Sequence, residues 1–109
     1  MKKTELRSIM LLAWQFVKRN GYTMREALKT AWMNWKLVEA LHREIVEFYY
    51  QKVDGSIRQA FGTLQSDVLP ETAGTKRAYD NCQVYYDTDR GEWRSFRKCN
   101  LRHVGRLTA

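Results

Sequence analysis

The chain has little cysteine, little proline and no long hydrophobic run. Cys82 and Cys99 are its only cysteines, and Pro70 is its only proline. The two cysteines form no metal-binding or redox motif, and a single proline excludes a proline-rich linker. No apolar stretch approaches the ~20 residues that a membrane span needs. We therefore expect a cytoplasmic protein with reduced thiols.

A secretory signal is not expected. Lys2 and Lys3 resemble the charged start of a signal peptide, but Glu5, Arg7 and Lys18 interrupt the run that follows. No small-residue cleavage site comes after it.

Enzyme motifs are missing as well. The sequence has no nucleophile elbow, phosphate-binding glycine loop or paired-carboxylate signature. A zinc site would have to use His42, Cys82, Cys99 and His103, whose spacing lacks the close cysteine pair of structural zinc sites. These absences predict a non-enzymatic protein with no metal and no cofactor.

Acidic residues are few, so the chain carries a formal charge of +7. Residues 1–42 hold eight Lys/Arg and three Glu, residues 43–75 hold three Lys/Arg and five Asp/Glu, and residues 76–109 hold eight and four. The two ends are basic and the middle is mildly acidic. Such a balance favours an anionic partner: nucleic acid, a nucleoprotein complex or an acidic protein surface.

Apolar residues recur at helical spacing in the first part of the chain. The pattern predicts a helix over residues 4–20, with a buried face made of Leu6, Ile9, Met10, Ala13, Phe16 and Val17. Gly21 is a typical helix stop, and Thr23 with Glu26 forms a capping box for a second helix from Met24 to about His42. The predicted buried face of this second helix is Met24, Ala27, Leu28, Ala31, Trp35 and Val38.

The period then changes to that of strands. Residues 44–53 are rich in β-branched and aromatic residues, and Asp54-Gly55 predicts a tight two-residue turn into a strand at residues 56–64. Residues 65–78 are expected to form a loop, and Gly62 to mark a bend or bulge. Three short strands are predicted at residues 82–87, 92–97 and 101–104, with a turn at residues 89–91.

These elements predict an α+β fold. A two-helix hairpin over residues 1–42 is followed by a five-stranded small β-barrel of the SH3/Sm-like kind over residues 43–109, and the two parts pack as one domain.

One candidate binding surface lies on the second helix. At ~100° per residue, its members fall within about 60° of one another. They are Arg25, Lys29, Trp32 and Lys36. Cations beside an aromatic ring suit a phosphate backbone and a stacking base. The alternative is an ordinary solvated helix face with Trp32 packed against the barrel.

A second candidate surface lies on the last two strands. Positive charge gathers there on Arg94, Arg97, Lys98 and Arg102. Alternation places Arg94 and Phe96 on one face of the strand, and Trp93 and Arg97 on the other. Arginine suits bidentate contacts with phosphate or carboxylate. The alternative is an exposed sheet edge that charge keeps soluble.

Two tyrosine pairs occur within predicted strands. Tyr49-Tyr50 and Tyr85-Tyr86 each place one ring inward and one ring outward. The outward rings are either a stacking platform or part of the core, as strand tyrosines commonly are.

The second half of the chain resembles a known family. The similar segments are Asp54-Gly55 to Leu64, Tyr85-Tyr86-Asp87, Gly91 to Phe96 and Asn100-Leu101. Over about residues 43–105 they resemble small SH3 β-barrel, Sm-like or "WYL-2" proteins of Bacteroidetes, their mobile elements and phages. The resemblance implies a barrel. By similarity to related WYL domains, it also implies that Arg94, Phe96 and Arg102 contact nucleic acid or nucleotide.

Four functions remain open at this point. The favoured one is a small basic binding protein of a phage or mobile element that acts on RNA, DNA or a nucleoprotein complex. The alternative is an anti-CRISPR inhibitor that docks on an RNA-guided nuclease or interferes with its guide RNA. The third is an oligomerising module, since Sm-like barrels often assemble through their edge strands. The fourth is an enzyme, for which no convergent set of residues speaks.

Overall fold

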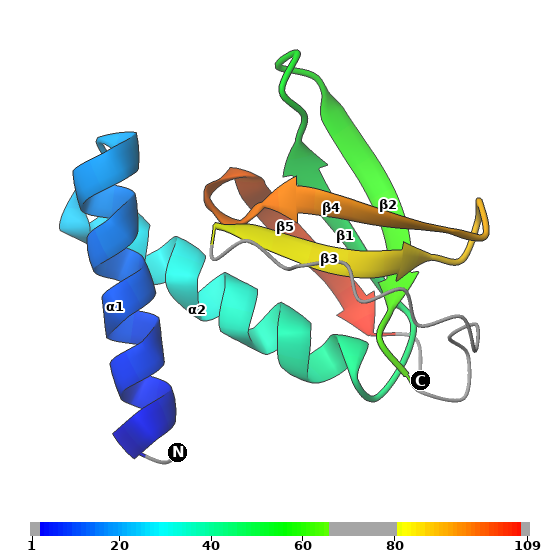
Figure 1. The fold of residues 1–109 in the computed structure, drawn as a ribbon, viewed down its shortest axis with the longest axis horizontal. Coiled ribbons are helices and arrows are strands. Elements are labelled where there is room, and N and C mark those ends of the chain that lie inside the picture. Colours follow the sequence, from blue (N-terminus) through cyan, green and yellow to red (C-terminus); the bar gives the residue numbers. More distant parts are fainter. Residues whose placement is uncertain (1–2, 66–80, 108–109) are drawn as a thin grey trace.

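A computed structural model describes residues 3–65 and 81–107. Two helices come first, α1 (Lys3–Asn20) and α2 (Met24–Leu41). Five strands follow: β1 (Val46–Gln51), β2 (Ile57–Thr63), β3 (Cys82–Asp87), β4 (Glu92–Arg97) and β5 (Leu101–Leu107). A short 3₁₀ turn, η1 (Lys98–Asn100), joins β4 to β5. Figure 1 shows α2 along the sheet and α1 on the outer side of α2.

The helix boundaries follow the sequence signals. Gly21 has φ 70°, the left-handed conformation that glycine adopts at low cost, and α1 ends at the residue before it. The Thr23 hydroxyl accepts the backbone N–H of Glu26 at 3.2 Å, which is the N-cap contact that the capping box predicts. The predicted helical hairpin is therefore confirmed.

The strands form one antiparallel sheet in the order β4-β3-β2-β1-β5. β1 lies in the middle, and β4 and β5 are the edges within the described part of the chain. The α+β class and the order of two helices before five strands are confirmed. The loop predicted for residues 65–78 lies, apart from Gln65, outside the described residues.

The β1–β2 hairpin is longer at its tip than the sequence predicts. The ladder ends at the pair Gln51–Ile57, so residues 52–56 make the connection rather than Asp54-Gly55 alone. The Asp54 carboxylate accepts the backbone N–H and the hydroxyl of Ser56, at 2.9 and 2.6 Å. These two bonds, with a smaller contribution from Lys52, hold the pKa of Asp54 below its ordinary value. The side-chain contacts of Asp54 stabilise this wider turn.

The core consists of two clusters that meet along α2. The larger cluster joins α2 to every strand of the sheet, and its members are Leu37, Ala40, Leu41, Val46, Phe48, Tyr50, Ala60, Tyr85, Phe96 and Leu101. The smaller cluster joins the two helices to η1, and its members are Ile9, Ala13, Phe16, Ala27, Ala31 and Cys99. α2 therefore has two buried sides, one toward α1 and one toward the sheet.

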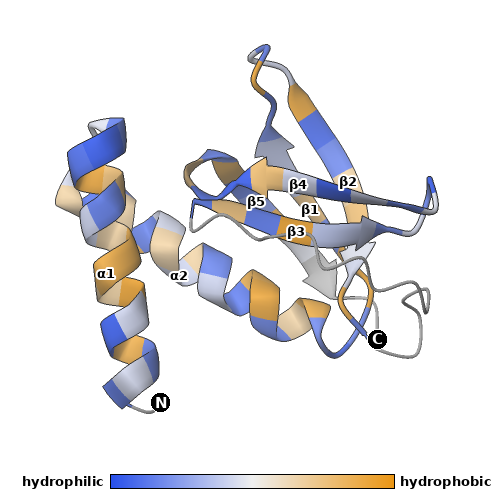
Figure 2. Ribbon diagram, in the orientation of Figure 1, coloured by the Kyte–Doolittle hydropathy of each residue, from blue (hydrophilic) through white to orange (hydrophobic). Residues whose placement is uncertain are grey.

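This arrangement corrects both predicted helix faces. On α2 the sequence pattern identifies the side toward α1, but it misses Leu37 and Leu41, which face the sheet and are fully buried. On α1 the predicted core residues Leu6 and Met10 are 46% and 39% exposed. The sequence prediction assumed one apolar stripe for each helix. Because α2 lies between α1 and the sheet, it needs two apolar stripes, one for each neighbour. Figure 2 shows the hydrophobic stretch in the middle of α1.

Membrane-spanning helices are not found in the described ranges, since neither α1 nor α2 combines the necessary length and apolar character.

Candidate functional site

The inner face of the sheet, which faces α2, carries a compact aromatic group. Phe48 and Tyr50 on β1 meet Tyr85 on β3 and Phe96 on β4. The Phe48 and Tyr85 rings are 5.0 Å apart edge to face, and the Tyr50 and Phe96 rings are stacked at 5.0 Å. Alternation along each strand places these four rings on the same side, so they form the floor on which the polar groups described next are placed.

Two of these rings carry hydroxyls that bond to each other. The oxygens of Tyr50 and Tyr85 are 3.0 Å apart, and both side chains are buried. Burial is the main cause that raises the pKa of Tyr85 far above its ordinary value, and the bond with Tyr50 and the charge of Asp87 add to it. Tyr85 is therefore a neutral hydrogen-bonding group and not a candidate base.

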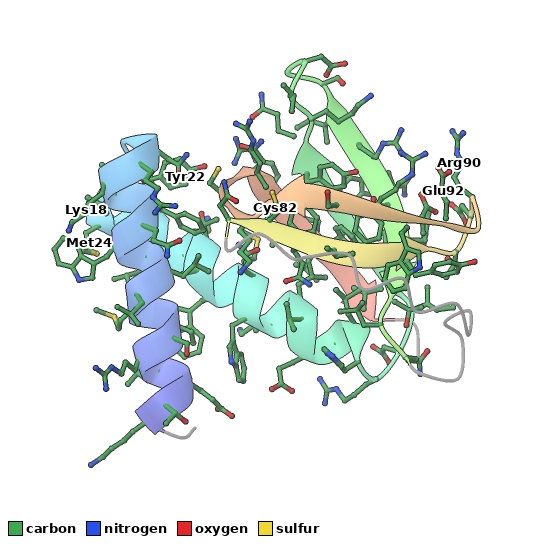
Figure 3. All side chains as sticks on the ribbon, in the orientation of Figure 1. Lys18, Tyr22, Met24, Cys82, Arg90 and Glu92 are labelled. Atoms are coloured by element: carbon green, nitrogen blue, oxygen red, sulfur yellow. The ribbon has the colours of Figure 1, made fainter. Side chains whose placement is uncertain are left out.

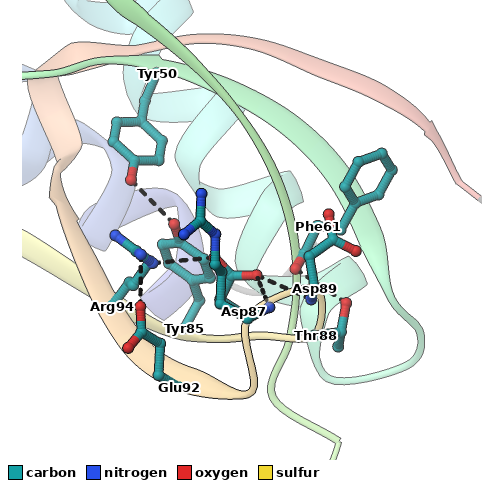
Figure 4. Close-up of polar contacts among 9 residues, drawn as sticks. Tyr50, Phe61, Tyr85, Asp87, Thr88, Asp89, Glu92 and Arg94 are labelled. Carbon is teal, nitrogen blue, oxygen red and sulfur yellow. Dashed lines mark hydrogen bonds and ion pairs between the residues drawn. The ribbon is translucent and has the colours of Figure 1, made fainter.

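An ion-pair network adjoins the tyrosines (Figure 4). Arg94 lies directly opposite Tyr85 in the β3–β4 register, and its Nε is 3.1 Å from Oδ2 of Asp87. Its Nη2 contacts Oε1 of Glu92. Asp87 is almost fully buried, and its Oδ1 accepts the backbone N–H groups of Asp89 and Arg90. Arg94 is thus held between two carboxylates, and its charge is largely compensated inside the protein.

Arg58 is the corresponding cation on the opposite wall. It pairs directly with Tyr50 in the β1–β2 register, and directly opposed residues share a face of the sheet. Its side chain is half-buried. Within residues 3–65 and 81–107, no carboxylate or hydrogen-bond acceptor contacts its guanidinium. Arg58 is therefore a cation at the edge of the aromatic floor that forms no ion pair with a described residue.

These groups line a cleft of about 630 Å³ between the tip of the β1–β2 hairpin and β4. We call it the hairpin cleft. Tyr50 and Phe96 contribute to its floor, while Arg58 and Arg94 come from its two walls. Further cationic lining comes from Lys52 on the hairpin and Arg97 at the end of β4. Lys52 has a weak exposed pair with Asp54, 3.8 Å apart.

The structure brings together three of the residues that the sequence identified on the last strands, but in different roles. Arg94 and Arg97 line the hairpin cleft. The ring of Phe96 is only 4% exposed and packs between Tyr50 and Tyr85, and its contact with a ligand stays a prediction. Phe96 faces inward because the side of β4 that carries Arg94 and Phe96 lies on the core. The opposite side of β4 carries Trp93. It shapes the floor of the cleft from below.

Lys98 and Arg102 lie elsewhere. Lys98 is half-buried in η1 and lines a groove between α1 and α2. Its backbone carbonyl accepts the side-chain amide of buried Asn34 at 2.8 Å, a contact that ties α2 to the end of β4.

Arg102 connects the helical hairpin to the sheet. Its guanidinium donates to the Cys99 carbonyl at 3.2 Å, to the Tyr22 hydroxyl at 3.3 Å and to Oε1 of Gln51 at 2.6 Å. The Tyr22 hydroxyl in turn donates to the same Cys99 carbonyl. Figure 3 shows Tyr22 between the helices and the sheet. These bonds give Arg102 a structural role at the margin of the cleft.

The predicted stripe on α2 is a separate surface. Arg25, Lys29 and Lys36 are exposed, as the sequence predicts. Trp32 is partly buried against the smaller core cluster, and its ring meets Trp35 edge to face at 6.3 Å. None of the four residues lines the hairpin cleft. The structure therefore provides two distinct basic surfaces; the cleft gathers several cations, whereas Lys36 of the stripe borders a separate pocket beside β5.

The tyrosine pairs divide as alternation predicts. Tyr50 and Tyr85 point inward and are buried, whereas Tyr49 and Tyr86 are half-exposed. The outward rings lie on β1 and β3, which β2 separates, and each contacts a different neighbour. They do not form one shared stacking platform. The zinc set is likewise not assembled, since no three potential ligands come together in the described residues.

Sequence reasoning missed Arg58 and Lys52 at this site. Both lie in a segment whose net charge is negative, so a search for basic clusters passes over them. A usable signal was present, because Arg58 occupies an inward position of an alternating strand, two residues before buried Ala60. A cation on the core side of a strand is unusual and indicates the end of a core or a site.

A family model described as "WYL_2, Sm-like SH3 beta-barrel fold" matches residues 34–102. The matched segment contains the second half of α2, β1 to β4 and the start of β5, and therefore every residue of the hairpin cleft. No curated protein and no solved structure matches the chain significantly.

Proposed function

The chain belongs to the WYL_2 family of Sm-like SH3 β-barrel fold, and from that premise we propose that it is a small binding protein whose hairpin cleft takes a phosphate group of nucleic acid, alone or within a nucleoprotein complex. The protein acts by binding and not by catalysis. Cytoplasmic location and origin in a phage or mobile element belong to the same proposal.

The observation that carries the proposal is the charge of Arg58. A half-buried cation loses part of its hydration, and this loss costs free energy unless an anion replaces the water. Arg94 obtains that compensation from Asp87 and Glu92, but no described carboxylate lies within ion-pair distance of Arg58. An anionic ligand in the cleft would provide the missing partner.

Phosphate suits the site better than a lone carboxylate. The cations of the cleft come from two separate segments, Lys52 and Arg58 on the hairpin and Arg97 on β4, so they can follow successive phosphates along a strand. Guanidinium groups present a planar set of donors that matches phosphate oxygens. The overall charge of +7 adds long-range attraction for a polyanion.

The experiment is a fluorescence anisotropy titration with labelled single-stranded RNA and DNA at several salt concentrations. The cleft variant is Arg58→Gln with Arg97→Gln. The competing surface is tested by Arg25→Gln with Lys29→Gln, and Arg19→Gln with Arg43→Gln is the matched control, since both arginines are exposed and line neither basic surface.

We expect the cleft variant to bind roughly thirtyfold to nine-hundredfold more weakly, because it loses two charge-assisted bonds to phosphate that contribute ~1–2 kcal/mol each. Its salt slope should fall by about 1.4, which corresponds to two lost phosphate contacts on a single strand. The control should change by about twofold at most. If the α2 variant alone weakens binding, the cleft is the wrong site; if no nucleic acid binds at low salt, the function is wrong.

A narrower form of the proposal is that the bound nucleic acid is the guide RNA of an RNA-guided nuclease, which the protein inhibits. The small size and the positive charge favour it. Purified protein added to a panel of such nucleases should stop target cleavage, and the Arg58→Gln/Arg97→Gln variant should restore it. Full cleavage across the panel would exclude this narrower form while leaving the binding result unaffected.

A further inference from the structure

The outer side of α1, which reaches at Leu11 the rim of the groove between α1 and α2, exposes an unusual amount of apolar surface. Leu6 is 46% exposed, Met10 39%, Leu11 58% and Trp14 47%. These are four of the large exposed hydrophobic side chains of the described chain, and all four lie within three turns of one helix. Isolated apolar side chains on a surface need no explanation, but four of them on neighbouring turns of one helix indicate an interaction surface.

Cations are interleaved with these side chains. At ~100° per residue, Lys3, Trp14, Arg7 and Lys18 follow one another within about 60° of the helix circumference. Leu6 and Met10 flank this column on one side, and Leu11 flanks it on the other. Lys18 projects from the side of α1 that faces away from the sheet (Figure 3). The only acid of α1, Glu5, falls on the opposite side of the helix.

The fold does not use this surface. α1 packs on α2 through Ile9, Ala13 and Phe16, which lie on the other side of the helix. The family match covers residues 34–102, so α1 lies outside it. None of the three cations has an ion pair with a described residue. The surface is therefore neither part of the core nor part of the hairpin cleft.

The position of the cations identifies the chemistry of the occupant. A helix that lies in a lipid surface keeps its cations at the margins of the apolar face, where they reach the headgroups. Here Arg7 lies in the middle of the face, next to Met10 and Leu11 on the following turn, and insertion into hydrocarbon would bury its charge, whereas Lys18 lies at the end of the face in the last turn of the helix. In a two-fold contact between two copies of the chain, the cations of one outer face would lie against the cations of the other and repel them. A protein helix with carboxylates beside its apolar residues satisfies both requirements.

We infer that the outer face of α1 docks an acidic amphipathic helix of a partner protein, whose leucine-type residues cover Met10, Leu11 and Trp14 while its carboxylates pair with Arg7 and Lys18. The contact is of the helix-against-helix kind, with apolar residues at three- and four-residue spacing in the seam and opposite charges along it. The site is independent of the nucleic-acid function, so the two are tested by different variants and probes.

The test uses the full chain and a synthetic peptide of about 20 residues, with leucine at the first and fourth heptad positions and glutamate at the flanking positions. A second peptide carries lysine in place of each glutamate. Binding is measured by isothermal titration calorimetry for the wild-type chain, for Arg7→Glu with Lys18→Glu and for Leu11→Gln with Trp14→Ser. The matched control is Arg19→Glu with Arg43→Glu, which makes the same change of charge at exposed positions off this face.

The acidic peptide should bind the wild-type chain, and each variant of the outer face should bind it at least about tenfold more weakly. The control should differ by about twofold or less. The lysine peptide should bind only the Arg7→Glu/Lys18→Glu variant, which no general loss of folding could produce. The inference is overturned if the acidic peptide does not bind, if the control weakens binding equally, or if phosphatidylserine-containing vesicles bind the outer face and the peptide does not.

Discussion

Replacing Gly62 by alanine tests how closely the core of the sheet is packed. Gly62 lies on the inner face of β2, and a Cβ atom placed there would lie 2.5 Å from Cδ2 of Tyr85 and 3.2 Å from Cε1 of Phe48. Both neighbours are fully buried ring atoms, so neither ring can move away without disturbing the aromatic floor. The sequence predicts a bend or bulge at this glycine, which stays a prediction, and the structure shows that its missing side chain makes room for Tyr85.

The magnitude follows from two opposing effects. Overpacking a well-filled core costs about 1–3 kcal/mol. Replacing a strand glycine by alanine stabilises the fold by about 0.5–1 kcal/mol, because the unfolded chain has less conformational freedom to lose on folding. The net loss is about 1–2 kcal/mol. With an unfolding entropy of ~2.1 cal/mol/K per residue, a chain of this length loses about 4 °C in Tm per kcal/mol, so Gly62→Ala should lower Tm by about 4–9 °C.

Thermal unfolding followed by circular dichroism measures this shift, and Gly62→Val is the decisive companion variant. Valine has a much higher strand propensity than alanine but a larger side chain. If packing against Tyr85 dominates, valine must be the more destabilising of the two. A valine variant that is as stable as the alanine variant, or more stable, would refute the reasoning.

Two further predictions concern titratable side chains. Burial raises the pKa of Tyr85, so its contribution to stability is complete below about pH 10, its ordinary pKa, and is lost as the pH rises further, because the unfolded chain releases the proton first. Urea unfolding at increasing alkaline pH should show a steeper fall for the wild-type chain than for Tyr85→Phe, and equal slopes would contradict this. Burial is also the main cause that raises the pKa of the Cys99 thiol, whereas Cys82 is half-exposed. Iodoacetamide should therefore modify Cys82 first, as peptide mass spectrometry will show, and preferential modification of Cys99 would be the contrary result.

Local signals were sufficient for the elements themselves. Thr23 and Gly21 place the ends of the helices because capping depends on a few neighbouring residues, and β3 and β4 begin and end where alternation and turn residues predict. The tip of the β1–β2 hairpin was less predictable. Its wider turn depends on how the Asp54 side chain bonds to Ser56, which competes with the tight turn that Asp54-Gly55 favours.

The candidate site was only partly visible from the sequence. Arg94 and Arg97 stand out because they lie in a basic run, and both line the hairpin cleft. Arg58 does not stand out, since its importance comes from the register that sets it beside Tyr50 and from its having no ion pair with a described carboxylate. Arg102 was expected at the binding surface, but it bonds to Tyr22 and Gln51, which are far from it in sequence.

The sequence by itself determined what depends on neighbouring residues: the two helices and their caps, the strands on either side of each tight turn, the inward position of Tyr50 and Tyr85, and the net positive charge. Only the tertiary structure decided which cations are compensated and which are open. That outcome depends on pairs of residues brought together across strands and between helix and sheet. The same position in a strand leaves Arg94 between two carboxylates and Arg58 with none among the described residues, because burial and charge pairing are properties of three-dimensional contacts.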